Sequence, residues 1–155
     1  MLTLTRIFHF EMAHALYGYP GDCRYIHGHS YALHVTVIPA DGNTEYIPAP
    51  GFVIDFKEFK NLVQKEVINK FDHKLALSPD FLATHPSFSS QENLLVTVAE
   101  PSAENLLITI KQALQKALPK KIKLLHLKLY ETRDSYASWL DNPQGKIDSI
   151  NSKIM

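Results

Sequence analysis

The sequence predicts an α+β fold in which an antiparallel sheet carries two helices on one face. Segments with alternating apolar residues indicate the strands, and two segments with apolar residues at helical spacing indicate the helices. The chain has 155 residues, 45% of them hydrophobic, which is enough for one domain with a substantial core. Because no repeat and no linker rich in Pro, Gly or Ser divides it, we expect a single domain over residues 1–155.

Five segments are predicted as strands, and the evidence differs between them. Every second residue is apolar from 31 to 37, and leucines occupy positions 125, 127 and 129, so each of these strands has one apolar face. A short strand or strand end is expected before the first helix, and another short strand within a long mixed segment at 78–100. The expected strands cover residues 2–10, 31–37, 51–54, 94–98 and 122–132.

The two helices have clear start signals. Asp55 and Glu58 form the Asp-x-x-Glu pattern of a capping box, and apolar residues follow at helical spacing to about residue 70. Ser102 is the expected N-cap of the second helix, and Glu104 lies in its first turn, where the helix dipole favours an acid. Pro119 is expected to end this helix.

Composition excludes several classes of protein. Sixteen Lys and Arg balance sixteen Asp and Glu, so the formal net charge is +0 and nothing favours nucleic acid or an anionic membrane as a partner. The only cysteine, Cys23, cannot form an internal disulfide. We find neither a signal-peptide pattern nor an apolar run of the ~20 residues that a spanning helix needs. We therefore expect a cytoplasmic protein.

The densest group of reactive side chains lies between residues 14 and 31. His27 and His29 are two residues apart at the entrance to a predicted strand, so both imidazoles point to the same side. Gly28 between them lets another segment approach closely. With His14 as a third donor, these histidines match the neutral nitrogen ligands of Zn²⁺, although polar loop histidines are the alternative. Four other histidines lack such neighbours and are expected as ordinary surface or core residues: His9, His34, His85 and His126.

Cys23, close to His27, has three possible roles. As a fourth ligand it would close the coordination shell and make the metal site structural. Beside a three-histidine metal with an open position, its thiolate would act as a base or nucleophile. An inert buried cysteine is the third reading, and the neighbouring histidines argue against it.

A second candidate site is the Asp72–His73 pair directly after the first helix. An Asp beside a His fixes the imidazole tautomer and raises its basicity, which suits general acid–base catalysis. The alternative is that His73 only stabilises the C-terminal end of the helix through the dipole. Spacing alone leaves both roles open.

A third candidate is Glu131, at the end of the last predicted strand. It has the parity of Leu125, Leu127 and Leu129, so its carboxylate should point toward the apolar side, where it needs a donor. The amino group and ring N–H of a pterin or guanine would supply a matching pair of donors. A strand-end glutamate that turns to solvent is the alternative.

In this order along the chain, the motifs resemble those of the 6-pyruvoyltetrahydropterin synthase/6-carboxytetrahydropterin synthase family. The resemblance runs almost from end to end, and the C-x-x-x-H-G-H element is its most specific part. The matching motifs are F-x-x-A-H at Phe10–His14, C-x-x-x-H-G-H at Cys23–His29, I-D-F at Ile54–Phe56, D-H at Asp72–His73, P-[TS]-x-E-N at Pro101–Asn105 and E-T at Glu131–Thr132.

The resemblance implies a set of roles for these residues. The three histidines would hold catalytic zinc, Cys23 would be the proton-abstracting thiolate, and Asp72–His73 would complete the proton relay. Glu131 would anchor the pterin ring, and the hydroxyl of Ser102, where the family more often has Thr, would contact it. The implied fold is the T-fold, in which strands of several subunits close a barrel, usually in a homohexamer with active sites between subunits.

The implied substrate is 7,8-dihydroneopterin triphosphate. In this chain three residues, Arg24–Ile26, separate Cys from H-G-H, and this spacing resembles that of the carboxy-forming branch of the family. That branch forms 6-carboxy-5,6,7,8-tetrahydropterin, acetaldehyde and triphosphate and serves 7-deazaguanine and queuosine synthesis. The alternative product is 6-pyruvoyltetrahydropterin, and a hydrolase or a structural zinc module are further alternatives. Phe71 replaces the usual Leu, the 78–100 segment is long, and the tail at 141–155 is expected to be flexible or to dock on a neighbour.

Overall fold

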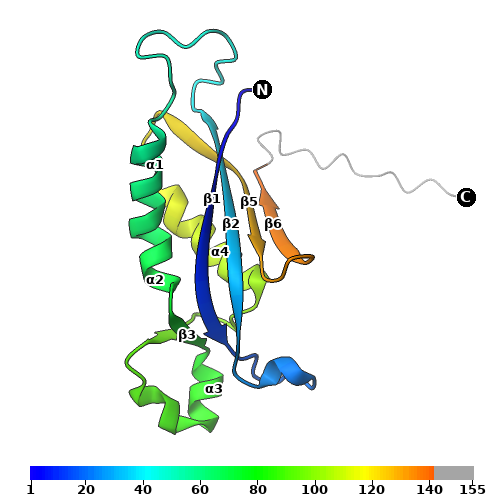
Figure 1. Cartoon of the computed structure of the whole chain (residues 1–155). Coiled ribbons are helices and arrows are strands. Elements are labelled where there is room, and N and C mark those ends of the chain that lie inside the picture. Colours follow the sequence, from blue (N-terminus) through cyan, green and yellow to red (C-terminus); the bar gives the residue numbers. More distant parts are fainter. Residues whose placement is uncertain (142–155) are drawn as a thin grey trace, which may run out of the picture.

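The structure, a computed structural model, describes residues 1–141 and contains a six-stranded sheet in the order β4-β3-β1-β2-β5-β6 (Figure 1). The strands are β1 (Leu4–His14), β2 (His27–Pro39), β3 (Lys74–Leu77), β4 (Leu94–Val96), β5 (Ile122–Tyr130) and β6 (Tyr136–Leu140). The helices are α1 (Phe56–Val63), the π-helical turn η2 (Gln64–Ile68), α2 (Asn69–Phe71), α3 (Pro79–Thr84) and α4 (Ala103–Ala117), and the 3₁₀ turns are η1 (Asp22–Arg24) and η3 (Pro86–Ser90). The α+β class is as predicted.

Strand direction agrees with the prediction for most of the sheet. β1, β2, β5 and β6 pair antiparallel, whereas β3 runs parallel to β1 and β4 runs parallel to β3. Parallel neighbours need a crossover connection. The helical segment 56–71 forms part of the connection that leads back to β3 beside β1. The segment with α3 and η3 forms the connection from β3 to β4. The sheet is therefore mixed rather than purely antiparallel.

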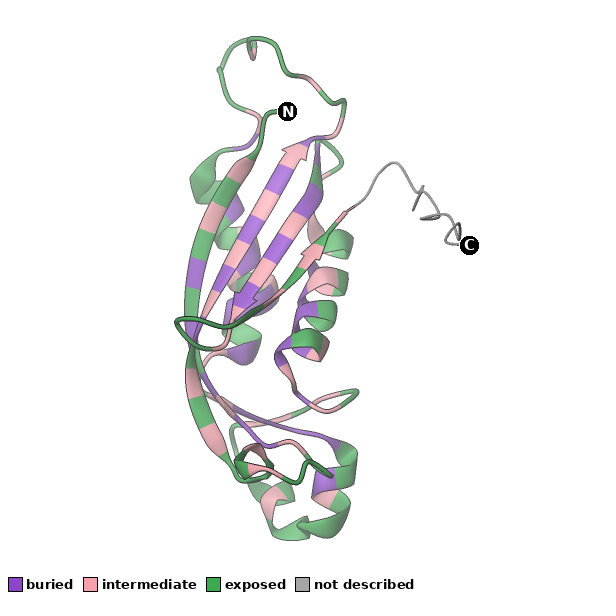
Figure 2. Cartoon of the chain, turned by 90° about the vertical axis from the view of Figure 1, so that its right-hand side faces the viewer, coloured by how far each residue is buried: buried purple, intermediate pink, exposed green. Residues whose placement is uncertain are grey.

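The core lies between one face of the sheet and the two long helical segments. Alternate residues of β2 from Tyr31 to Val37 are fully buried, as are Leu127 and Leu129 on β5. Figure 2 shows this alternation as bands along the strands, with the helices behind them. Phe10 of β1 stacks on Tyr31 with ring centroids 5.0 Å apart. The helices cover one face only, so the other face of the sheet is free for polar side chains.

Both predicted helix starts are confirmed. Oδ1 of Asp55 accepts a hydrogen bond from the backbone N–H of Lys57 at 2.7 Å, and Oγ of Ser102 accepts one from Asn105 at 3.3 Å. α4 ends at Ala117, two residues before Pro119. The first helical segment includes the π turn η2, which a simple 3.6-residue spacing does not reveal.

Several boundaries differ from the prediction. β1 extends to His14, so this histidine lies on a strand. The expected strand at 51–54 is wrong: it is irregular, and its apolar character reflects Ile54, which packs into the core. β3, β6 and α3 were not predicted, although Ser78 caps α3 by accepting from Phe81. Within residues 1–141, no helix is long and apolar enough to cross a membrane. The expectation for the tail at 141–155 lies outside the described residues, apart from Asp141.

Candidate metal centre

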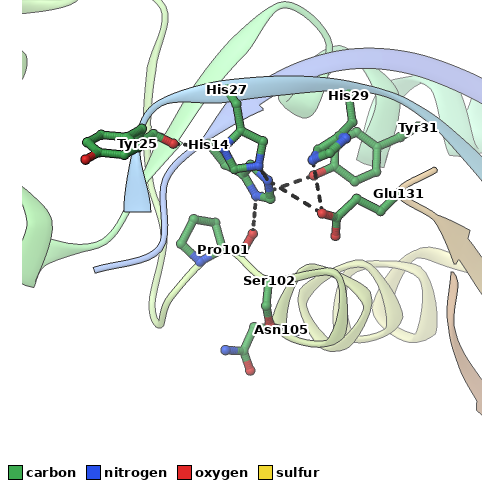
Figure 3. A network of polar contacts seen from close by, with 9 residues as sticks. All are labelled: His14, Tyr25, His27, His29, Tyr31, Pro101, Ser102, Asn105 and Glu131. Atoms are coloured by element: carbon green, nitrogen blue, oxygen red, sulfur yellow. Dashed lines mark hydrogen bonds and ion pairs between the residues drawn. The ribbon is translucent and has the colours of Figure 1, made fainter. Parts of the chain in front are cut away.

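The three histidines predicted as metal ligands lie together at one end of the sheet. β1 ends at His14 and β2 begins at His27, and the antiparallel register places these two residues opposite each other. His29 follows two residues along β2, on the same face. A ligand atom of each, together with a carboxylate oxygen of Glu131, lies within 4.8 Å of all the others (Figure 3). We call these four residues the histidine cluster.

Backbone carbonyl groups determine which nitrogen of two of these rings faces the cluster. Nδ1 of His14 donates to the carbonyl oxygen of Pro101 at 2.6 Å, and Nδ1 of His27 donates to that of Tyr25 at 2.8 Å. Since a neutral imidazole has a single N–H, Nε2 of each ring carries a lone pair. The two Nε2 atoms lie only 3.0 Å apart. Two lone pairs this close require either a proton or a metal ion to bind them.

Burial of these imidazole rings disfavours their protonation. It is the largest cause that lowers the pKa of His14 and of His29, and the neighbouring His27 lowers both further, whereas the Glu131 carboxylate opposes these effects. Both rings therefore favour the neutral form, which is the form that binds a metal. The buried Tyr31 hydroxyl lies 3.5 Å from Nδ1 of His14, and burial raises the pKa of Tyr31 far above its usual value, so it stays a neutral phenol.

The third imidazole contacts the carboxylate of the cluster. Nε2 of His29 lies 3.0 Å from Oε1 of Glu131 but is a buried nitrogen without a hydrogen bond among the described residues. The same carboxylate oxygen lies 3.8 Å from Nε2 of His14. Since its contact with Glu131 lacks hydrogen-bond geometry, Nε2 of His29 is a buried nitrogen that a bound metal ion would satisfy. Three imidazoles beside one carboxylate are compatible with Zn²⁺.

Cys23 is not among the ligand atoms that converge. It lies in η1, half-buried, and its carbonyl oxygen accepts a hydrogen bond from Leu16 that closes the intervening loop. The fourth member of the cluster is Glu131, whose inward orientation was predicted from strand parity but whose contact with the histidines was not. The residues next to Glu131 in the sequence do not predict this contact, because the pairing of β5 with β2 in the sheet is what brings Glu131 near the histidines.

The Asp72–His73 pair lies at the edge of β1 rather than in the cluster. Asp72 accepts a hydrogen bond from the backbone N–H of Glu11, and Nδ1 of His73 lies 2.9 Å from the Asp72 carboxylate. These hydrogen bonds lower the pKa of Asp72, with Glu11 the largest cause. The expected Asp–His contact is confirmed, and the His73 side chain is 79% exposed, so the pair is accessible from outside this chain.

The backbone of His73 is held in an unusual conformation. Its φ angle is +59°, which lies in the left-handed region that most residues avoid. The N–H of His73 donates to the carbonyl oxygen of Glu11 at 2.6 Å, and the side-chain amide of Asn93 donates to the carbonyl oxygen of His73 at 3.1 Å. Asn93 belongs to the long segment before β4, so that segment helps to position His73.

A cavity of about 440 Å³ adjoins the cluster between the start of α4 and the turn after β5. Glu131, Glu104 and Thr132 contribute polar side chains to its wall. Ser102 is not part of this wall, and its hydroxyl is occupied by the cap of α4. The role predicted for Ser102 in binding a ligand stays a prediction, whereas Glu131 lies both in the cavity wall and in the cluster.

Fold and site together define an α+β protein whose sheet carries a histidine-rich candidate metal centre at one end. A sequence model of the family described as 6-pyruvoyl tetrahydropterin synthase matches residues 3–141. The chain therefore belongs to the 6-pyruvoyl tetrahydropterin synthase family, as the sequence resemblance implied.

Curated relatives share part of the sequence. The chain is 38% identical over 80 residues to the 6-carboxy-5,6,7,8-tetrahydropterin synthase of Rickettsia typhi, which covers 52% of this chain and 54% of the relative. It is 36% identical over 74 residues to the enzyme of the same name from Haemophilus influenzae, covering 47% and 50%. The match thus spans about half the length of these relatives.

Solved structures match over a greater length. The 6-pyruvoyl tetrahydropterin synthase of Caenorhabditis elegans has a TM-score of 0.64 at 20% identity, covering 91% of this chain and 96% of the other. The Plasmodium vivax enzyme of that name has a TM-score of 0.65 at 17% identity, covering 92% and 99%. An uncharacterised protein of Wolinella succinogenes has a TM-score of 0.69 at 17% identity, covering 91% and 98%. These similarities show that the chain has the fold of a single T-fold chain, without showing how copies assemble.

Proposed function

We propose that this protein is a zinc-dependent lyase that converts 7,8-dihydroneopterin triphosphate and one water molecule to 6-carboxy-5,6,7,8-tetrahydropterin, with release of acetaldehyde and triphosphate, in 7-deazaguanine and queuosine biosynthesis. The convergence of three imidazoles beside Glu131 is the observation that supports it most. The names of the curated relatives and the three-residue spacing between Cys23 and His27 favour the carboxy product.

His14, His27 and His29 would hold the zinc ion. When bound, zinc supplies a Lewis acid that makes C–H bonds next to coordinated side-chain oxygens more acidic. The carbonyl groups of Pro101 and Tyr25 keep Nε2 of two of these rings unprotonated and directed into the histidine cluster, where they would bind the ion. Three protein ligands would leave positions for substrate oxygens.

Glu131 would orient the pterin ring in the adjoining cavity. Its two carboxylate oxygens match the amino group and ring N–H of a pterin, which are parallel donors. The cavity of about 440 Å³ has room for a bicyclic ring. In this role Glu131 fixes the ring while the side chain of the substrate extends toward the histidines.

Cys23 and the Asp72–His73 pair would move the protons. The Cys23 thiolate would take a proton from one carbon of the substrate side chain and become a thiol, and His73, oriented by Asp72, would give a proton to another carbon. Asp72 and His73 lie outside the histidine cluster and are accessible, which supports the proposal that they serve the site of a neighbouring subunit. The proposed assembly is a homohexamer with active sites between subunits.

Two other functions follow from specific observations. The family description and several similar structures favour 6-pyruvoyltetrahydropterin as an alternative product. A purely structural zinc module was a further alternative, with Cys23 as fourth ligand. It is less well supported because Glu131, beside an open cavity, is the fourth member of the cluster.

Incubation of the zinc-loaded protein with 7,8-dihydroneopterin triphosphate separates these functions. Acetaldehyde together with triphosphate supports the proposal, whereas triphosphate without acetaldehyde supports the pyruvoyl product. If neither is released, the lyase function is refuted. Treatment with a chelator should abolish turnover and leave the circular dichroism spectrum unchanged, whereas a structural module should unfold.

A further inference from the structure

The face of the sheet opposite the helices contains a hollow of about 410 Å³. Ala32 on β2 forms its floor, because this small residue pairs with His9 on β1 and with Tyr130 on β5, both much larger. His34, two residues along β2, stacks against Tyr130 with ring centroids 5.1 Å apart and forms one wall. The remaining lining residues are Ser30, Thr132 and Arg133. We call this feature the open-face hollow.

The lining of the hollow offers hydrogen-bond donors and no carboxylate. Two imidazoles, one guanidinium and the hydroxyl groups of Tyr130 and Thr132 line it, whereas the Ser30 hydroxyl already donates to Glu11. Arg133 forms no ion pair or hydrogen bond through its side chain within residues 1–141. Glu11 lies at the border of the hollow, where one of its carboxylate oxygens accepts a hydrogen bond from Ser30 at 2.7 Å. The guanidinium is thus available to an external ligand.

Further basic residues surround the hollow. Lys128 on β5 pairs with His34 in the register, and His126 lies two residues before it. Burial is the main cause that lowers the pKa of His34, followed by Lys128, His9 and His126, all of which are basic. The formal net charge of the chain is +0, so this concentration of basic residues, with the charges of Lys128 and Arg133, is local. Such a region favours an anion.

We infer that the open-face hollow is a binding site for a phosphate-type oxyanion, held by Arg133, His34 and His9. A guanidinium matches two oxygens of such an anion, and the N–H groups of the two imidazoles add further hydrogen bonds. This site goes beyond the proposed function, because none of its three ligands belongs to the histidine cluster. The two sites approach each other at Thr132, which lines both the hollow and the cavity beside Glu131.

Titration calorimetry of the zinc-loaded protein with inorganic pyrophosphate tests the inference. We expect saturable binding that weakens about tenfold or more in Arg133→Gln and His34→Gln, since the first removes a positive charge and each removes a hydrogen bond to the anion. The control is Lys60→Gln on α1, which removes one positive charge at an exposed position away from the hollow and should change nothing. Ala32→Leu fills the floor without changing charge and should also abolish binding. Absence of saturable binding, or equal losses in Lys60→Gln, overturns the inference.

The pH dependence gives a second test. The charged and titratable groups that face the hollow or its border are His9, Glu11, His34, His126, Lys128, Arg133 and the phenols of Tyr130 and Tyr136. Sulfate keeps a constant charge between about pH 6 and pH 8, so stronger sulfate binding at the lower pH reports protonation of the imidazoles. Unchanged sulfate affinity across this range contradicts the role of His34 and His9.

Two further measurements separate this site from the proposed reaction. Pyrophosphate binding should persist after zinc is removed, even if the lyase function is refuted. If pyrophosphate no longer binds once zinc has been removed, the anion binds at the histidine cluster and the inference is overturned. If 7,8-dihydroneopterin triphosphate displaces pyrophosphate, the phosphates of a ligand beside Glu131 reach the hollow. If it does not, the ligand is a free anion.

Discussion

The Glu131 carboxylate should strengthen zinc binding, and Glu131→Gln tests this directly. Gln keeps the shape of the side chain and removes its negative charge. Oε1 of Glu131 lies 3.0 Å from Nε2 of His29 and 3.8 Å from Nε2 of His14, so the charge acts on the ligands and on any cation that they bind. We expect the substitution to lower zinc affinity without unfolding the protein.

The size of the effect follows from these distances. Two unit charges about 4 Å apart interact by about 4 kcal/mol at an effective dielectric constant of about 20. Water screens part of this because the Glu131 side chain is 25% exposed. Carboxylates next to metal-binding histidines typically contribute about 10- to 100-fold to metal affinity, equivalent to about 1.4–2.8 kcal/mol. We therefore expect a loss of affinity in this range.

Competition with a chromogenic chelator measures the zinc dissociation constant. Glu104→Gln is the matched control, since Glu104 lines the same cavity but is not in the histidine cluster, and its zinc affinity should stay unchanged. Unchanged zinc affinity in Glu131→Gln, or an equal loss in Glu104→Gln, refutes the electrostatic role assigned to Glu131.

Three further predictions concern the cysteine, the histidines and the loop. Cys23→Ala should keep its zinc content and thermal midpoint but lose turnover, and unchanged turnover refutes the thiolate role. Burial lowers the pKa of His14 and His29 below the usual 6.5, so the unfolded chain binds more protons than the folded chain as the pH falls through this value. Urea unfolding of the metal-free protein should therefore show a free energy of unfolding that falls between about pH 7 and pH 5. A free energy of unfolding that does not change with pH contradicts burial as the cause. Asn93→Ala removes the hydrogen bond to the His73 carbonyl, so urea unfolding should show a free energy of unfolding lower by about 0.5–1.5 kcal/mol. The zinc affinity should stay unchanged. A free energy of unfolding equal to that of the wild type would show that the bond contributes nothing.

The parts of the site that follow from local periodicity could be predicted from the sequence. Strand alternation alone places His27 and His29 on one side, and parity along β5 directs Glu131 inward. Both predictions are confirmed because side-chain direction in a strand depends only on position. The same local reasoning identified Asp55 and Ser102 as caps, since an N-cap bonds to a residue two or three positions away.

The features that depend on distant segments could not be predicted. The carbonyl oxygen that orients His14 belongs to Pro101, 87 residues later, and no local pattern connects the two. β3 has only four residues and is recognisable only once it pairs with β1. The apolar run ending at Ile54 suggested a strand, but the tertiary fold uses it as a loop anchored in the core.

The turn before α4 joins the metal centre to the hydrophobic core. Ser102 starts the helix, and the buried Leu107 and Ile110 fix that helix against the sheet. The carbonyl oxygen of Pro101 therefore has a position set by helix packing, and it accepts from Nδ1 of His14 at 2.6 Å. Because this bond determines that Nε2 of His14 faces the cluster, the core holds His14 in the tautomer that the proposed zinc site requires. Displacement of α4 would release that constraint, so under the proposed function we expect zinc affinity to depend on the packing of α4.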